Sequence, residues 1–153
     1  MRIVIAGAGE VGTHLAKMLS NEELNIVLMD MDEKKLERAS HHLEVLPVVG
    51  NPTQLQDLEQ ARVEGADLFV AVTPDESMNI MACVLAKRVG ARHTIARTNN
   101  ASYLNGEYTA LMEELGVDSM IYPEELAANE IAAITEYPWA RQYITLFNGA
   151  LIL

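Results

Sequence analysis

A glycine-rich turn near the N-terminus constrains the fold of this chain more than any other feature. Gly7, Gly9 and Gly12 are spaced as G-x-G-x-x-G, directly after the β-rich run 2–6. The residues that follow carry apolar side chains at helical spacing. A glycine turn between a strand and a helix can hold the phosphates of a ligand at the helix N-terminus. The sequence therefore predicts a βα unit that binds a dinucleotide.

Each glycine of the turn has a separate predicted role. Gly7 allows the tight turn, Gly9 lets the backbone approach a pyrophosphate, and Gly12 lets the helix pack closely against the sheet. The alternative is a purely structural turn that binds nothing.

Short β-rich runs alternate with helical patterns along most of the chain, which indicates an α/β protein. Short connections between them favour right-handed crossovers and a parallel sheet covered on both faces. We expect a doubly wound Rossmann fold with a six-stranded sheet in the order 3-2-1-4-5-6. The predicted strands are 2–6, 25–30, 45–49, 67–72, 93–97 and 118–121.

The C-terminal part predicts a helix followed by a hairpin. Residues 124–136 carry an apolar face rich in alanine, and Asn148 and Gly149 form a two-residue hairpin signal within 143–153. We therefore expect one domain over 1–136 and a crossover extension over 137–153. Because the chain ends on an apolar strand, we also expect a fragment of a longer protein.

Composition narrows the classes of partner. The 153 residues fit one domain, and 11 basic against 22 acidic residues give a net charge of −11. That charge would repel a nucleic acid backbone. No apolar run reaches membrane-spanning length, the first predicted strand follows Met1, and the single Cys83 fits reducing surroundings. We expect a cytoplasmic protein that does not insert into the membrane, with Cys83 packed in the core.

Asp30 is the second candidate ligand residue. It ends the second predicted strand 18 positions after Gly12, near the spacing at which a carboxylate accepts hydrogen bonds from the adenosine ribose. The 2′-phosphate of NADP would lie close to the carboxylates of Asp30 and Asp32, and their repulsion disfavours NADP. The nearby cations Lys34 and Lys35 could reduce that repulsion. Capping of the next helix is an equally good role for Asp32.

Other strands end on the same rim and supply further candidates. The segments 50–53 and 72–77 follow the third and fourth strands, and open α/β sheets bind ligands along this edge. Asp75 is expected to cap the following helix. Arg97, at the end of the fifth strand, could bind a phosphate or pair with Glu76.

The sequence shows no recognisable set of catalytic residues, so we expect that the protein is not an enzyme. The four histidines, His14, His41, His42 and His93, have no obvious nucleophile or metal partner nearby in the pattern. The rival functions are the cofactor-binding fragment of an NAD-dependent oxidoreductase and a methyltransferase. The first would need a substrate domain, and the second usually has an acidic residue just before the glycines, where Ile5 and Ala6 stand.

Taken together, these motifs resemble the N-terminal nucleotide-binding module of the RCK or KTN family, and within it the TrkA-type regulators of bacterial potassium uptake. The resemblance covers nearly the whole chain in the order of the family. The matching segments are 2–16, 29–32, 49–51, 66–73, 75–76 with Asn79, 95–97, 116–118 and 123–124.

The resemblance implies binding of NAD or NADH, with ATP and ADP as rivals. ATP-binding relatives often carry a basic residue at the position of Glu10. The Glu10 carboxylate would repel the terminal phosphate of ATP, so the resemblance favours NAD(H). The implied cofactor-binding residues are Gly7, Gly9, Glu10, Val11, Gly12, Asp30, Met31, Asn51, Thr73 and Arg97.

The resemblance also implies a regulatory output. Such modules pair as homodimers or larger homo-oligomers through the helix after the sixth strand, here 124–136, and act on a membrane potassium transporter by conformational change. The small C-terminal domain that follows in the family is absent from these 153 residues.

Overall fold

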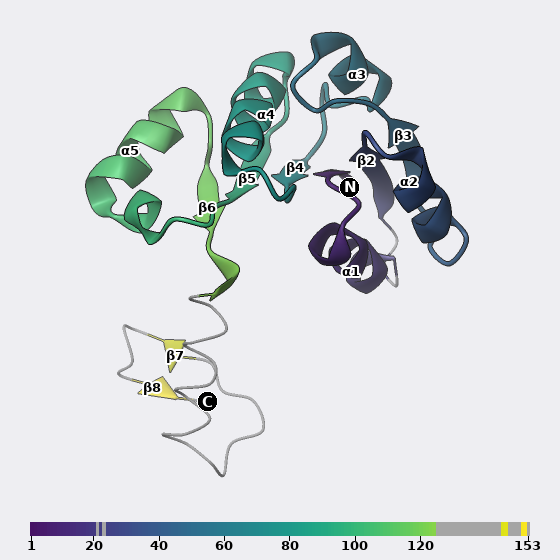
Figure 1. Cartoon of the computed structure of the whole chain (residues 1–153). Coiled ribbons are helices and arrows are strands. Elements are labelled where there is room, and N and C mark those ends of the chain that lie inside the picture. The colour runs from purple at the N-terminus through teal and green to yellow at the C-terminus, as the bar shows by residue number, and fades with distance from the viewer. Residues whose placement is uncertain (21, 23, 125–144, 147–150, 153) are drawn as a thin grey trace. The chain divides into compact units, whose positions relative to one another are not determined.

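The computed structural model describes residues 1–20, 22, 24–124, 145–146 and 151–152. The chain divides into two compact units, Met1–Tyr122 and Pro123–Leu153. The first unit contains the predicted sheet and its helices (Figure 1).

Six strands of the first unit form one parallel sheet in the order β3-β2-β1-β4-β5-β6, as predicted. Their bounds agree with the sequence pattern to within one residue at each end. The strands are β1 Arg2–Ala6, β2 Asn25–Asp30, β3 Leu46–Val49, β4 Leu68–Ala71, β5 His93–Arg97 and β6 Ser119–Ile121.

Helices cover both faces of this sheet (Figure 1). One face packs against α1 Glu10–Leu19 and α2 Glu33–Ser40. The other packs against α3 Leu55–Gln60, α4 Glu76–Val89 and α5 Gly106–Leu115, which follows the short 3-10 helix η1 Ala101–Leu104.

Successive side chains of the central strand β1 point to opposite faces of the sheet and enter two separate hydrophobic cores. Ile3 and Ile5 face the α1 and α2 side, whereas Val4 and Ala6 face the α3 to α5 side. All four side chains are at most 2% exposed. A strand buried on both faces needs a continuous apolar run rather than an alternating one, which is what residues 3–6 provide.

Aspartates cap two of the helices, as expected for Asp75 and as one of the two roles considered for Asp32. The Asp32 side chain accepts a hydrogen bond from the Lys34 N–H at the start of α2, and Asp75 accepts one from the Met78 N–H at the start of α4. Each bond satisfies an N–H group that has no partner within the helix.

The apolar face of α1 is less buried than its pattern suggests. Gly12 and Ala16 are the buried residues of α1, while Met18 is 61% exposed. Val11, Leu15 and Leu19 pack against the core without being fully buried.

The second unit contains the antiparallel pair β7 Thr145–Leu146 and β8 Leu151–Ile152. This pairing agrees with the predicted hairpin in 143–153. The turn at Asn148 and Gly149 lies outside the described residues, as does the predicted helix 124–136 beyond its first residue.

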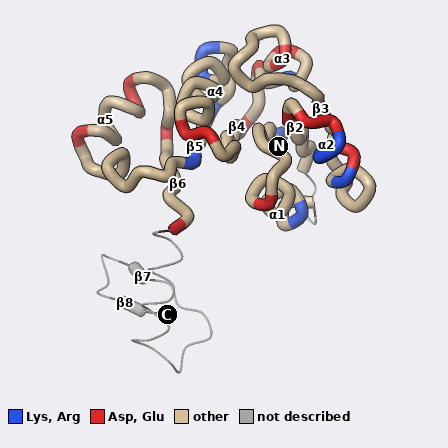
Figure 2. The backbone as a smooth tube through the Cα atoms, in the orientation of Figure 1, with Lys and Arg blue, Asp and Glu red and all other residues tan. Residues whose placement is uncertain are grey.

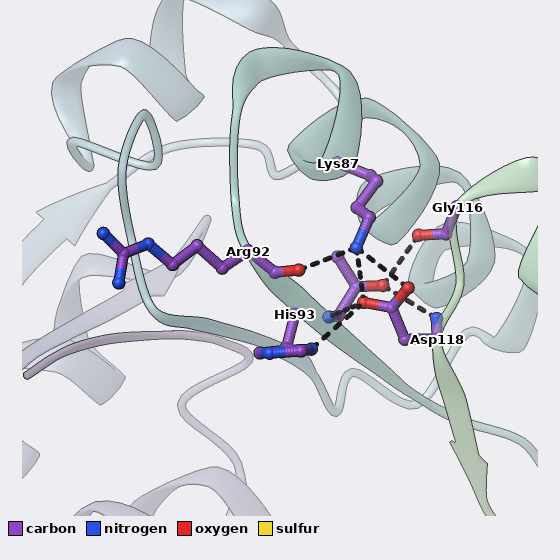
Figure 3. Close-up of polar contacts among 6 residues, drawn as sticks. Lys87, Arg92, His93, Gly116 and Asp118 are labelled. Carbon is purple, nitrogen blue, oxygen red and sulfur yellow. Dashed lines mark hydrogen bonds and ion pairs between the residues drawn. The ribbon is translucent and has the colours of Figure 1, made fainter.

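A polar cluster joins α4, β5 and β6 at the rim where these two strands begin (Figure 3). The Lys87 Nζ donates to both carboxylate oxygens of Asp118, at 2.9 and 2.7 Å, and to the Arg92 carbonyl. Asp118 also accepts from the Thr94 N–H, and the Thr94 hydroxyl donates to the Gly116 carbonyl. This cluster fixes the edge strand β6 to its neighbours.

No helix in the part of the chain that the structure describes is long and apolar enough to cross a membrane.

Candidate functional site

The glycine turn has the geometry that its spacing predicts. Gly7 has a φ of +114°, and a Cβ there would lie 3.0 Å from the Thr73 nitrogen. A Cβ on Gly12 would overlap the Gly7 carbonyl oxygen, so the start of α1 can approach the turn only without a side chain. A Cβ on Gly9 would have no heavy atom within 4 Å. The surface beside Gly9 is therefore open to a ligand.

Asp30 ties the end of β2 to this turn. One carboxylate oxygen accepts a hydrogen bond from the Ala8 N–H at 2.7 Å, and the other accepts one from the Asp32 N–H at 2.9 Å. An ionised carboxylate can accept about four hydrogen bonds. Asp30 therefore organises the turn and retains acceptor capacity for ribose hydroxyls.

Asn79 of α4 connects the ends of β4 and β5. Its Oδ1 accepts from the N–H and the hydroxyl of Thr73, and its Nδ2 donates to the carbonyls of Thr73 and Arg97. Asn79 is fully buried. These four bonds place Thr73 and the Arg97 backbone at the same rim, a role that its position in the sequence did not reveal.

Asn51 is held in a tight turn after β3. Its N–H donates to Asp57 of α3 at 2.8 Å, and its Oδ1 accepts from both the N–H and the hydroxyl of Thr53. Much of the hydrogen-bonding capacity of Asn51 is therefore used by Thr53 and Asp57.

The Glu76 carboxylate lies at the same rim. Its Oε2 accepts from the Thr98 hydroxyl at 2.7 Å and from the Asn99 N–H at 2.9 Å. Glu76 thus fixes the segment that follows β5, directly after Arg97.

These loops surround a cleft at the carboxyl edge, where the strand order reverses between β1 and β4. It contains about 540 Å³ of space free of protein atoms, part of which is open to solvent. Four predicted residues line it: Gly7, Asp30, Met31 and Thr73. The other lining residues are Met29, Lys35, Pro52, Pro74, Asp75 and Met78.

The remaining predicted residues lie elsewhere around the turn. Gly9 and Glu10 line a second hollow, together with Ala8, Thr13, Ala39 and two basic residues of α2. Val11 faces an apolar groove along α1, and Asn51 and Arg97 are not among the residues that line the cleft.

Neither histidine nor cysteine is among the described residues that line the cleft. The four histidines are exposed, and no group of three or more metal-ligating side chains occurs among the described residues. Cys83 is buried as expected, and burial raises the pKa of its thiol to about 12. A thiol that stays protonated at neutral pH is a poor nucleophile.

Comparison with known proteins identifies the family. The TrkA-N domain matches residues 3–123, which include the whole parallel sheet except its first residue. The chain belongs to the TrkA-N domain family. The predicted resemblance to the TrkA-type modules is thereby confirmed.

Relatives of this TrkA-N chain are Trk system potassium uptake proteins. The TrkA homolog of Archaeoglobus fulgidus is 38% identical over 151 residues, which cover 97% of this chain and 34% of that protein. The TrkA protein of Halomonas elongata is 34% identical over 153 residues, which cover 99% of this chain and 33% of that protein. The chain thus spans about a third of the length of these relatives.

Solved structures share the TrkA-N fold. The TrkA-N domain of inner membrane protein ybaL from Escherichia coli has a TM-score of 0.75 at 18% identity, covering 87% of this chain and 95% of that one. The GsuK channel bound to NAD has a TM-score of 0.66 at 17% identity, covering 78% of this chain and 21% of that one. GsuK bound to ADP has a TM-score of 0.68 at 23% identity, covering 90% of this chain and 34% of that one.

Proposed function

We propose that this TrkA-N chain is the nucleotide-binding part of a cytoplasmic regulator of potassium uptake. Its ligand is NAD or NADH, with ATP and ADP as rivals. The cleft at the carboxyl edge carries the proposal, because Gly7, Asp30 and Thr73 line it beside the open backbone of Gly9.

The chemistry of the cleft suits an adenosine group. Pro52, Met31 and Met78 offer apolar surface to a planar base, and the Asp30 carboxylate can accept hydrogen bonds from ribose hydroxyls. The N–H groups at the start of α1 and the positive end of its dipole suit the phosphates that follow. No step of this binding needs a catalytic group.

Relatives support the same ligand class and the same process. The relatives reported above are potassium uptake proteins, and structures of similar fold include GsuK with NAD and with ADP. The preference for NAD(H) rests on Glu10, whose carboxylate would repel the terminal phosphate of ATP.

The proposed output is a conformational change. A ligand in the cleft contacts loops that follow three strands, around Asp30, Asn51 and Thr73, and draws them toward the turn at Gly9. Pairing of two chains through 124–136 would pass this movement to a membrane potassium transporter. The ligand can bias the transporter by no more than its difference in affinity for the two states.

Calorimetric titration of the wild type and of Gly9→Asp with NADH, NAD, ATP and ADP tests the proposal. Aspartate is a good N-cap residue and has room at this position, so the variant should fold. Its carboxylate should repel the phosphates, and we expect binding to be lost. Gly106→Asp, at the start of α5 and also without atoms within 4 Å of its Cβ, is the control and should bind normally.

Unchanged binding by Gly9→Asp would show that the site is wrongly assigned. Consumption of NADH by the wild type without added enzyme would favour the oxidoreductase alternative.

A further inference from the structure

Methionine supplies most of the apolar surface of the cleft at the carboxyl edge. Met29, Met31 and Met78 line it, and the other apolar side chains among the described lining residues are those of Pro52 and Pro74. Those described residues include no leucine, isoleucine, valine or aromatic side chain. Thioether groups pack favourably against flat rings, and they are also readily oxidised. The surface that we assign to the base is therefore chemically reactive.

The three methionines differ in their access to solvent. Met29 is fully buried, Met78 is half-buried and Met31 is 56% exposed. Met31 directly follows the last residue of β2 and is the only uncharged residue of the segment 30–35. Figure 2 shows acidic and basic residues close together along α2, which begins within this segment. An oxidant dissolved in water would therefore reach Met31 first among the three.

Exposure alone does not distinguish Met31, because Met1, Met18 and Met81 are also at least 50% exposed. None of these three lines the cleft. Met18 lies near the end of α1, and Met81 lies on α4. Among the described methionines, Met31 alone is both exposed and part of the cleft. Oxidation of the other three would leave the surface for the ligand unchanged.

We propose that Met31 is an oxidative modification site, and that conversion of its thioether to a sulfoxide weakens nucleotide binding. This inference rests on the proposed function and adds regulation by a peroxide to it. The sulfur attacks one oxygen of hydrogen peroxide, so that an S–O bond forms while the O–O bond breaks. The hydroxide that leaves takes the proton of the new S–OH group and becomes water. The sulfur thereby loses two electrons, which the peroxide gains.

The sulfoxide changes the surface that the base contacts. Oxidation replaces an apolar group by a polar S–O group, and covering a polar group without a hydrogen-bond partner costs free energy. The new oxygen can only accept hydrogen bonds, and it lies on the residue next to the Asp30 carboxylate, which also only accepts them. We expect the oxidised cleft to bind its nucleotide about three- to tenfold more weakly. A bound nucleotide should in turn cover Met31 and slow its oxidation.

Peptide mass spectrometry after timed exposure to hydrogen peroxide tests the position of Met31. The protein is treated alone and with saturating NAD, or with saturating ADP if the wild type binds ADP more tightly. The nucleotide should slow sulfoxide formation at Met31 at least about threefold, since susceptibility follows exposure. Met18 and Met81 are controls within the same molecules, and their rates should not change. An equal rate at Met31 with and without nucleotide would overturn the proposal.

Calorimetric titration with the same nucleotide, before and after the peroxide treatment, measures the consequence. The wild type should lose affinity about three- to tenfold, and reduction by methionine sulfoxide reductases should restore it. Met31→Leu, which has similar volume and no sulfur, should show the same affinity before and after treatment. Met18→Leu is the matched control and should lose affinity as the wild type does.

Two results of this titration would overturn the modification site. One is an unchanged affinity of a wild type whose Met31 is fully converted to the sulfoxide. The other is an equal loss in Met31→Leu and in the wild type. A wild type that binds no adenine nucleotide before any peroxide is added would instead refute the proposed function itself. The two failures are therefore distinguishable.

Discussion

Gly9 and Gly12 belong to one turn, yet an added side chain would meet different surroundings at the two positions. Gly12→Ser should destabilise the fold by about 1–3 kcal/mol or more, because its Cβ would overlap the Gly7 carbonyl oxygen. Gly9→Ser should change the free energy of unfolding by less than about 0.5 kcal/mol, since serine fits both the space and the N-cap position. Urea denaturation of both variants measures the difference, and equal stabilities would contradict this account of the turn.

Asn79 concentrates four hydrogen bonds at a fully buried position. Asn79→Ala should therefore lower the free energy of unfolding by about 2–4 kcal/mol, because it leaves polar groups of Thr73 and Arg97 without partners. Asn79→Asp keeps the acceptor but loses both donated bonds, so it should also destabilise. Ser77→Ala, on an exposed position of α4, serves as the control. Thermal melts of the three variants test this, and a stable Asn79→Ala protein would refute it.

Residue roles could be predicted where they depend on local backbone geometry. The glycine spacing determined the turn, and Asp75 could be assigned as a cap from its place before α4. Roles that depend on contacts between distant segments were not predictable. Nothing in the sequence near Asn79 says that its amide reaches Arg97, 18 positions away. Pro52 and Met78 likewise line the cleft only because the segment after β3 and the start of α4 meet there.

At the scale of elements, the Asp118 cluster links α4, β5 and β6 (Figure 3). Burial opposes ionisation of Asp118, but the hydrogen bonds from Lys87 and from the Thr94 N–H, with the charge of Lys87, outweigh it and lower the pKa. A carboxylate with a lowered pKa in the folded state stabilises the fold above its unfolded pKa of about 3.9. That contribution is lost as the pH falls through the folded value.

Asp118→Asn should therefore be less stable than the wild type at neutral pH, with a difference that is constant down to about pH 5. Below about pH 4 the difference should shrink, because the unfolded wild type then takes up a proton at Asp118 more readily than the folded wild type. It should disappear below the lowered pKa of the folded state, where the folded wild type also lacks the charge. Denaturation at a series of pH values measures it. A difference that does not depend on pH would mean that the charge of Asp118 contributes nothing to holding β6.

Strands and their order followed from the sequence more completely than the helices did. Short β-rich runs between polar turns marked each strand of the parallel sheet, and the doubly wound pattern of alternating strands and helices suggested the order. The exposure of Met18 could not be read from its spacing, since the apolar face of α1 is broader than its contact with the sheet. The domain division at 136 and the pairing through 124–136 stay predictions.

At the scale of the whole molecule, both cores lie within Met1–Tyr122. A chain of residues 1–124 should therefore fold by itself and unfold in a single cooperative transition, as small domains usually do. Circular dichroism during urea denaturation, compared with fluorescence, tests this. Two separate transitions, or none, would show that the first unit depends on residues beyond it.

The reaction rate of the buried Cys83 thiol would report local opening of the protein. Its thiol lies on the inner side of α4, donates to the Ile95 carbonyl and is the only one in the chain. A disulfide reagent in solution can react with it only while α4 is separated from β5. The labelling rate therefore counts how often this part of the protein opens, and a nucleotide that closes the cleft would slow it without any change to the chain.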